Sequence, residues 1–221
     1  MLAYYAYAVA QQGDYGDARP LAEEALAIGI REDLPWMQQI ALHTLGLLAF
    51  QHEDHAIARE LFDRALVQSR RLGDGLYIAT ALGYLGLIDI RERAWERAYE
   101  RLVEALQIAR AIHSPKAIAL VFEGLAYLWT IRGEWDRAAQ LFGAIEMIYL
   151  RRGALPAPLN YELHMPYVHA ARVNLGGQGF ALAWARGQKL TLEAACALAS
   201  GPIAPRPMAW AEERALALGA V

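Results

Sequence analysis

The sequence is poor in cysteine, in lysine and in surplus charge. Its single cysteine, Cys196, excludes a disulfide framework and a zinc site built from thiolates, and it fits a reducing compartment. The 21 basic residues are outnumbered by 24 acidic ones, which leaves a formal charge of -3. Proteins that hold nucleic acid by its phosphates need a clustered basic surface, so we expect no direct nucleic-acid contact.

Long hydrophobic runs are also missing. The longest, such as residues 45–50 and 117–122, fall far short of the ~20 residues that span a bilayer, so we expect no membrane-spanning segment. The first residues, Met-Leu-Ala-Tyr-Tyr, have no basic stretch before an apolar core and do not resemble a signal peptide. A hydrophobic content of 56% in 221 residues excludes a disordered chain. The composition therefore predicts a soluble, cytoplasmic protein.

What the sequence does contain is an internal repeat with a step of 40 residues. The Leu-Gly pair at residues 45–46 recurs at 85–86, as Leu-Ala at 125–126 and as Tyr-Ala at 5–6. Four further columns repeat with the same step of 40 residues: an alanine, the residue four positions after it, the residue seven positions after it, and an aromatic residue shortly before it. In that order the columns are Ala18, Ala58, Ala98 and Ala138; Ala22, Phe62, Leu102 and Phe142; Ala25, Ala65, Ala105 and Ile145; and Tyr15, His55, Trp95 and Trp135. Five aligned columns over four repeats argue against a chance match.

Each repeat is predicted to be a pair of helices. In the second repeat the apolar positions fall at i, i+3, i+4, i+7 and i+8 from Ala58, which places them on one helical face. Gly13 and Gly133 stand between the paired helices, where a helix commonly ends in a left-handed residue. The middle repeats carry Glu53 and Arg93 at this position, so we expect their turns to be slightly more strained or differently shaped.

Helix stops and starts also separate the repeats. They are Asp33-Leu34-Pro35, Gly73-Asp74-Gly75 and Ser114-Pro115. We therefore expect four hairpins within residues 1–152, at about 1–33, 34–73, 74–113 and 114–152. The small residues of the Leu-Gly and alanine columns are expected where the two helices of a hairpin approach closely.

The 40-residue rule fails after the fourth repeat. Residues 153–200 still have helical patterns, with Pro166 as a kink or late start, a break at 176–179 and Thr191 as an N-cap. We expect this region to cap the last apolar face of the array. Residues 201–221 form a proline-rich linker with a terminal helix near 209–218.

The repeat resembles the tetratricopeptide (TPR) pattern, which has Leu-Gly in its first helix and alanine followed by a large apolar residue in its second. That repeat has about 34 residues, so each helix or turn here is longer. The resemblance covers about residues 2–150. It implies an all-α fold, namely a TPR-like α-α superhelix (solenoid) of four helical hairpins plus a helical C-terminal cap, whose concave wall is lined by the first helix of each pair.

A second resemblance begins at Arg137. The stretch is similar to the end of the repeat region in bacterial LuxR-type, MalT-like transcriptional regulators, and the residues that carry it are 137–146, 153–156, 180–184, Gly187, Leu190 and 192–195. Those regulators join an ATP-binding module, a helical-repeat sensor region and often a C-terminal helix-turn-helix. Nothing in this sequence resembles the ATPase or the DNA-binding helices. The resemblance therefore implies a non-catalytic sensing or protein-interaction segment in signal transduction and transcription regulation; the alternative is a stand-alone TPR scaffold or adaptor that binds a peptide or partner protein.

Candidate reactive groups lack the partners that chemistry requires. His52 and His55 have carboxylates between them but lie in a predicted turn without an evident third and fourth metal ligand. His164 and His169 are five apart, not the four of a helical histidine pair. The glycine-rich 176–179 lacks the preceding strand and the Gly-Lys-Ser/Thr ending of a phosphate loop. We expect no catalytic residue, no metal and no cofactor, and we interpret Cys196 as a buried small hydrophobe.

The concave wall is the candidate binding surface. It is apolar and aromatic, without the Lys, Arg and Asn clamp of chaperone-adaptor TPR domains. Three interpretations stay open: helix packing buries these residues, the segment after Gly153 or a second copy in a homodimer covers them, or a peptide, partner protein or small effector binds them. The wall residues are Tyr4, Tyr7, His43, Leu47, Phe50, Tyr84, Leu87, Ile90, Glu123 and Tyr127.

Overall fold

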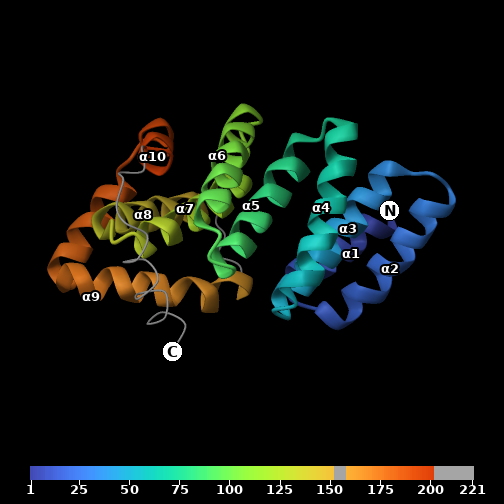
Figure 1. Ribbon diagram of the computed structural model, residues 1–221, viewed down its shortest axis with the longest axis horizontal. Coiled ribbons are helices and arrows are strands. Elements are labelled where there is room, and N and C mark those ends of the chain that lie inside the picture. Colours follow the sequence, from blue (N-terminus) through green and yellow to red (C-terminus); the bar gives the residue numbers. More distant parts are fainter. Residues whose placement is uncertain (152–157, 202–221) are drawn as a thin grey trace. The chain divides into compact units, whose positions relative to one another are not determined.

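The computed structural model describes residues 1–151 and 158–201, and this part of the chain is helical apart from its turns, without a strand (Figure 1). None of the helices in it is apolar over enough length to cross a membrane. The linker and terminal helix predicted beyond residue 201 lie outside the described residues. The helices are α1 (Leu2–Gln12), α2 (Tyr15–Arg31), α3 (Pro35–Gln51), α4 (His55–Leu72), α5 (Gly75–Arg91), α6 (Trp95–Ala111), α7 (Pro115–Ile131), α8 (Trp135–Leu150), α9 (Pro158–Gln188) and α10 (Leu192–Ala199).

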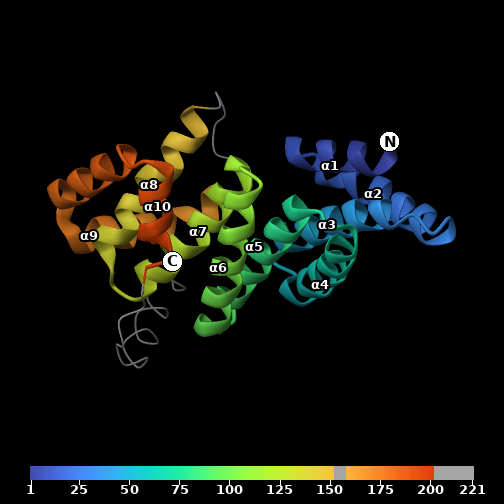
Figure 2. The ribbon, with the colours of Figure 1, turned by 90° about the horizontal axis from the view of Figure 1, so that it is seen from above.

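The chain divides into two compact units, Met1–Ala117 and Ile118–Val221. In the first unit each helix from α1 to α6 packs on the next along the chain, and α3 also contacts α1 and α5 (Figure 2). In the second unit α8 packs on both α9 and α10. This succession of helical hairpins confirms the all-α fold class that the repeat predicts.

The turn inside each hairpin has the same backbone geometry in all four repeats. Its left-handed residue is Gly13 (φ 92°), Glu53 (60°), Arg93 (60°) or Gly133 (75°). Of the two alternatives expected for the middle turns, added strain or a different shape, the shared left-handed conformation fits added strain. A side chain with a Cβ in this region costs roughly 1–2 kcal/mol, because the Cβ approaches the following carbonyl oxygen.

Small residues allow the two helices of a hairpin to approach closely. The four alanines of the alanine column are fully buried. A Cβ added to Gly46 would lie 3.1 Å from the Phe62 ring, and one added to Gly86 would lie 2.7 Å from Cγ of Leu102. The Leu-Gly column of each first helix thus packs against the large apolar column of the second helix, and both columns recur together.

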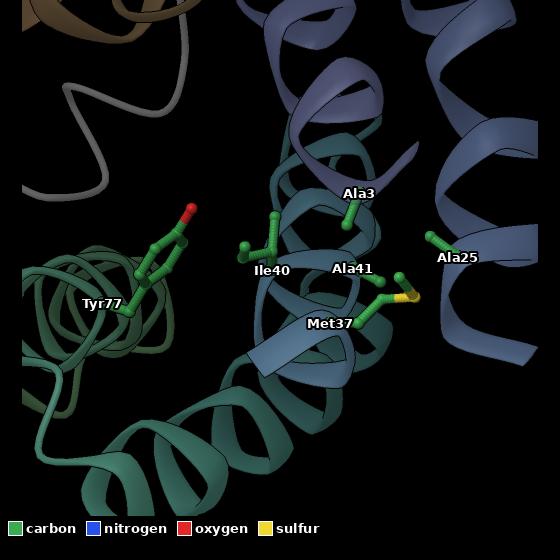
Figure 3. Packing of buried hydrophobic residues seen from close by; sticks show 6 residues of the cluster. All are labelled: Ala3, Ala25, Met37, Ile40, Ala41 and Tyr77. Carbon is green, nitrogen blue, oxygen red and sulfur yellow. The ribbon is translucent and has the colours of Figure 1, made fainter. Parts of the chain in front are cut away.

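The first helices of the middle hairpins are enclosed on all sides. Every residue of α3 from Gln39 to Phe50 is buried, and the same holds for α5 from Ala79 to Ile90. Residues of α1, α2, α3 and α5 meet in one part of this core (Figure 3). They are Ala3, Ala25, Met37, Ile40, Ala41 and Tyr77.

In the second unit two glycines bring α8 and α9 into backbone contact. A Cβ on Gly187 would overlap the carbonyl oxygen of Gln140, and one on Gly143 would overlap the carbonyl oxygen of Trp184. The Trp184 indole Nε1 also donates to Glu146 across this contact, at 2.5 Å. Close backbone approach is thus the reason that glycine stands at these two positions.

The last described helix is held by two donors. Trp129 Nε1 donates to the carbonyl of Ala199 at 3.1 Å, and Arg137 Nε donates to the carbonyl of Leu198 at 2.7 Å. Thr191 caps the other end of α10 by accepting from the Ala194 amide, as predicted. The break predicted in the glycine-rich stretch occurs at Gly176, where α9 leaves helical geometry, whereas α9 begins before Pro166.

Arg93→Gly is expected to stabilise the chain by about 0.5–1 kcal/mol, because glycine removes the left-handed strain but adds backbone freedom to the unfolded state. Arg93 is exposed, so its side chain contributes little to packing. Urea unfolding measures the change. Gly133→Ala is the matched control and should destabilise by a similar amount; a destabilised Arg93→Gly chain would contradict the strain assignment.

Gly187→Ala is expected to destabilise the second unit by at least ~2 kcal/mol, because the methyl group meets backbone and not a flexible side chain. Gly179→Ala is the control on the same helix, since its added Cβ would make only an ordinary 3.5 Å contact with Leu175. Thermal unfolding of both variants makes the comparison. Equal melting temperatures would show that α8 and α9 do not cross at Gly187.

Candidate functional site

Most of the predicted concave wall is buried. Tyr4 is the exception, with 56% of its surface exposed, and Tyr7 is half-buried. Burial of this kind is what the packing interpretation expects. The buried members are His43, Leu47, Phe50, Tyr84, Leu87, Ile90, Glu123 and Tyr127.

In the second unit, the segment after Gly153 covers its part of the wall. The Tyr127 ring stacks on Tyr167 of α9 with ring centroids 4.1 Å apart, and the Tyr127 hydroxyl lies 3.4 Å from Nδ1 of His164. Glu123 accepts a hydrogen bond from the Tyr149 hydroxyl at 3.2 Å. Tyr127 and Glu123 thus both contact side chains of their own unit.

In the first unit, aromatic rings surround His43. Its imidazole is only 2% exposed and meets four rings edge to face. The ring centroids lie 5.1 Å away for Tyr77, 5.5 Å for Phe62, and 6.0 Å for both Tyr7 and Tyr84. We call these five residues the His43 cluster. They come from α1, α3, α4 and α5, so the cluster joins three successive hairpins.

Polar atoms of His43, and of Gln39 beside the His43 cluster, lack partners within the described residues. Among residues 1–151 and 158–201, neither imidazole nitrogen of His43 has a hydrogen-bond partner, and neither has Oε1 of Gln39, which lies one helical turn earlier. Gln39 is itself 2% exposed and uses only its Nε2, which donates to Asp74 at 2.9 Å. A buried polar group left unpaired costs about 1–3 kcal/mol, so these unpaired atoms destabilise the folded state.

Burial also decides the charge of His43. Burial, together with the smaller effect of the nearby positive charge of Lys116, lowers the pKa of the imidazole from 6.5 to about 3. His43 is therefore neutral near pH 7 and offers one donor and one acceptor. A general acid or base works best with a pKa near the working pH, which makes His43 suited to binding and poorly suited to proton transfer.

Lys116, in the first turn of α7 and within the first unit, ties the cluster to α1. Its Nζ donates to the Tyr7 hydroxyl and to Oε1 of Gln11, both at 2.8 Å. Nζ lies 5.1 Å from the Tyr7 ring centroid, and the short hydroxyl contact places it at the rim of the ring, so the contact is a hydrogen bond more than a cation–π interaction. The ammonium group thus fixes the tyrosine that flanks His43.

A second buried polar group, the Asp89 carboxylate, was not predicted from the sequence. Asp89 of α5 is fully buried and forms ion pairs with Arg59, Arg97 and Arg101, at 2.8, 2.7 and 2.7 Å. These pairs tie α4, α5 and α6 together. A signal was available in the repeat, because the residues one step before and after Asp89 are apolar. Since three arginines satisfy the carboxylate, we interpret this network as structural.

The histidines of the turn sequence do not form a metal site. Within residues 1–151 and 158–201, no group of three or more His, Cys, Asp or Glu side chains is placed to hold a metal ion. His55 packs against Phe50 with ring centroids 5.8 Å apart. Cys196 is buried in α10.

Comparisons with protein-family models, with curated proteins and with solved structures found no match.

The stability of the fold is expected to depend on pH through His43. Its folded pKa is depressed, so the unfolded chain takes up the proton first; this contribution is complete above pH 6.5 and is lost as the pH falls toward 3. One such histidine costs about 2 kcal/mol between pH 6.5 and 5. In urea unfolding, the free energy of unfolding of His43→Leu should therefore fall by about 2 kcal/mol less than that of the wild type between pH 6.5 and 5.

His169→Leu is the control, because His169 is exposed. His164, whose pKa burial lowers to about 4, is present in all three proteins and provides a common background. If His43→Leu and wild type lost stability in parallel, the imidazole would not be buried as described.

Proposed function

We propose that this chain is a non-catalytic sensing and protein-interaction segment, of the kind that the resemblance to MalT-like, LuxR-type regulators implies. On this view a TPR-like array of hairpins receives an effector or a partner and passes the event to neighbouring parts of a signalling system. The proposal places the sensing step in the first unit.

The observation that carries the proposal is the set of unpaired polar atoms of His43 and of Gln39 beside it. Both nitrogens of His43 and Oε1 of Gln39 are buried where α1, α3 and α5 meet, and no described residue is their hydrogen-bond partner. An apolar side chain at either position would avoid that cost. Sites at which a protein departs from its own packing rules are those where function is expected.

The geometry suggests how an effector would act. Repeats of this type contact only their neighbours, so each shared contact helps to set the curvature of the array. An effector or peptide group that pairs with His43 and Gln39 has to part the surrounding rings, which belong to three hairpins. It would therefore favour one arrangement of the hairpins over another, in proportion to its preference for that arrangement.

The experiment is a thermal-shift screen of the chain against sugars, nucleotides and peptides, each class tested separately. We expect one class to raise the melting temperature; a ligand at 100 times its Kd stabilises the folded state by about 2.7 kcal/mol. His43→Leu should abolish that shift, and His169→Leu should keep it. If no class stabilised the wild type, or if His43→Leu responded equally, the proposal would fail.

A further inference from the structure

The polar groups left unpaired at the His43 cluster define what a ligand there has to offer. Nε2 of Gln39 donates to the Asp74 carboxylate at 2.9 Å. A carboxylate only accepts, so this bond fixes the orientation of the amide and leaves its Oε1 as an acceptor. His43, four residues later on the same face of α3, adds one acceptor and one donor, because its ring is neutral. A ligand that pairs with these groups therefore has to carry a hydrogen-bond donor.

The same surroundings disfavour a charged ligand. A buried charge without a counter-charge is costly, and burial already keeps the His43 ring neutral. The positive charge of Lys116 near the cluster repels a cation, and the Asp74 carboxylate beside Gln39 repels an anion. The part of the ligand that enters the cluster is therefore uncharged.

Aromatic walls and few polar groups favour an aromatic ligand over a sugar or a nucleotide. The four other rings of the cluster lie within 6.0 Å of the His43 ring, centroid to centroid. A sugar carries hydroxyl groups on every side, and most of them would be left unpaired among these rings. A nucleotide adds the negative charge of its phosphate. An aromatic ring packs edge to face or offset against such walls, and tryptophan and tyrosine combine a ring with a donor.

Tyr7 is the ring of the cluster that can make way for such a side chain. Phe62 is fully buried and stacks on Tyr84, with ring centroids 4.9 Å apart. Tyr77 and Tyr84 are each only 8% exposed. Tyr7 is half-buried, and the exposed Lys116 holds its hydroxyl. Tyr7 therefore leaves the cluster at the lowest cost, and the hydrogen bond from Lys116 opposes its leaving.

We propose that the effector is a peptide whose tryptophan or tyrosine side chain takes the place of the Tyr7 ring and pairs with His43 and Gln39. This inference rests on the proposed function and names, among its three ligand classes, the one that the site fits. Lys116 is then a latch, which holds Tyr7 in the cluster of the free chain and releases it when the peptide binds. Because Lys116 also bonds Gln11, the latch connects the binding event to the position of α1.

The test titrates the whole chain, labelled with nitrogen-15 at histidine, with N-acetyltryptophanamide, an uncharged equivalent of a peptide tryptophan. We expect the His43 signals to shift and to saturate with a Kd on the order of 1 mM, the weak end of specific affinity. N-acetyl-1-methyltryptophanamide is the matched probe, because it has the same ring without the N–H donor. It should bind at least about fivefold more weakly.

The Lys116 latch makes a prediction that a purely structural role would not make. Lys116→Met removes both hydrogen bonds and should bind the probe about three- to tenfold more tightly, since Tyr7 is released in a larger fraction of the chains. Tighter binding cannot result from a damaged fold. Lys189→Met is the matched control, because Lys189 is the other lysine of the chain, is exposed and belongs to the second unit. It should bind like the wild type.

The outcomes separate this inference from the proposed function. If a sugar or a nucleotide stabilised the chain through His43 while N-acetyltryptophanamide left the His43 signals unchanged, the peptide class would be wrong and the proposed function would stand. Equal binding of the two tryptophan probes, or unchanged or weaker binding by Lys116→Met, would also overturn the inference. If no ligand of any class shifted the His43 signals, water would be what satisfies these groups, and both proposals would fail.

Discussion

Close approach of helix backbones is the constraint on which this structure depends. It is secured by small residues that recur every 40 positions: the buried alanine column of the second helices, and the glycines that pack on Phe62 and Leu102. Backbones this close leave no room for side chains to move aside, which is why volume changes at such contacts are costly. The second unit applies the same device between α8 and α9, with a pair of glycines in place of the alanine column.

This packing has a consequence for the first helices. Because α3 is flanked by α1, α2, α4 and α5, even its polar residues are buried. His43 is thereby held neutral among rings, with hydrogen-bonding capacity that the fold leaves unused. Asp89 of α5 is buried as well, but arginines from α4 and α6 form ion pairs with its carboxylate. Asp89 is thus paired within the described residues and His43 is not, and this difference is the basis of the proposed function.

The repeat made the helices predictable, and the left-handed turn residues with them. Pro35 and Pro115 begin helices where the sequence places helix starts, because proline suits the first turn. What a 40-residue column does not reveal is the number of neighbours that a helix has. Tyr4 and Tyr84 share a column, yet one is 56% exposed and the other 8%, since only α5 has a helix packed before it. The ring contacts of His43 likewise depend on side chains from four helices, which no local pattern links.

The central claim is that the hairpins close around a neutral imidazole that has no hydrogen-bond partner in the described part of the chain. Nitrogen-15 NMR of the folded chain, labelled at histidine and followed from pH 7.5 to 4.5, tests it most directly. The account predicts that His43 keeps the shifts of a neutral ring throughout, because its folded pKa is about 3. A His43 signal that titrated near pH 6.5, the ordinary value of a solvent-exposed imidazole, would contradict the account.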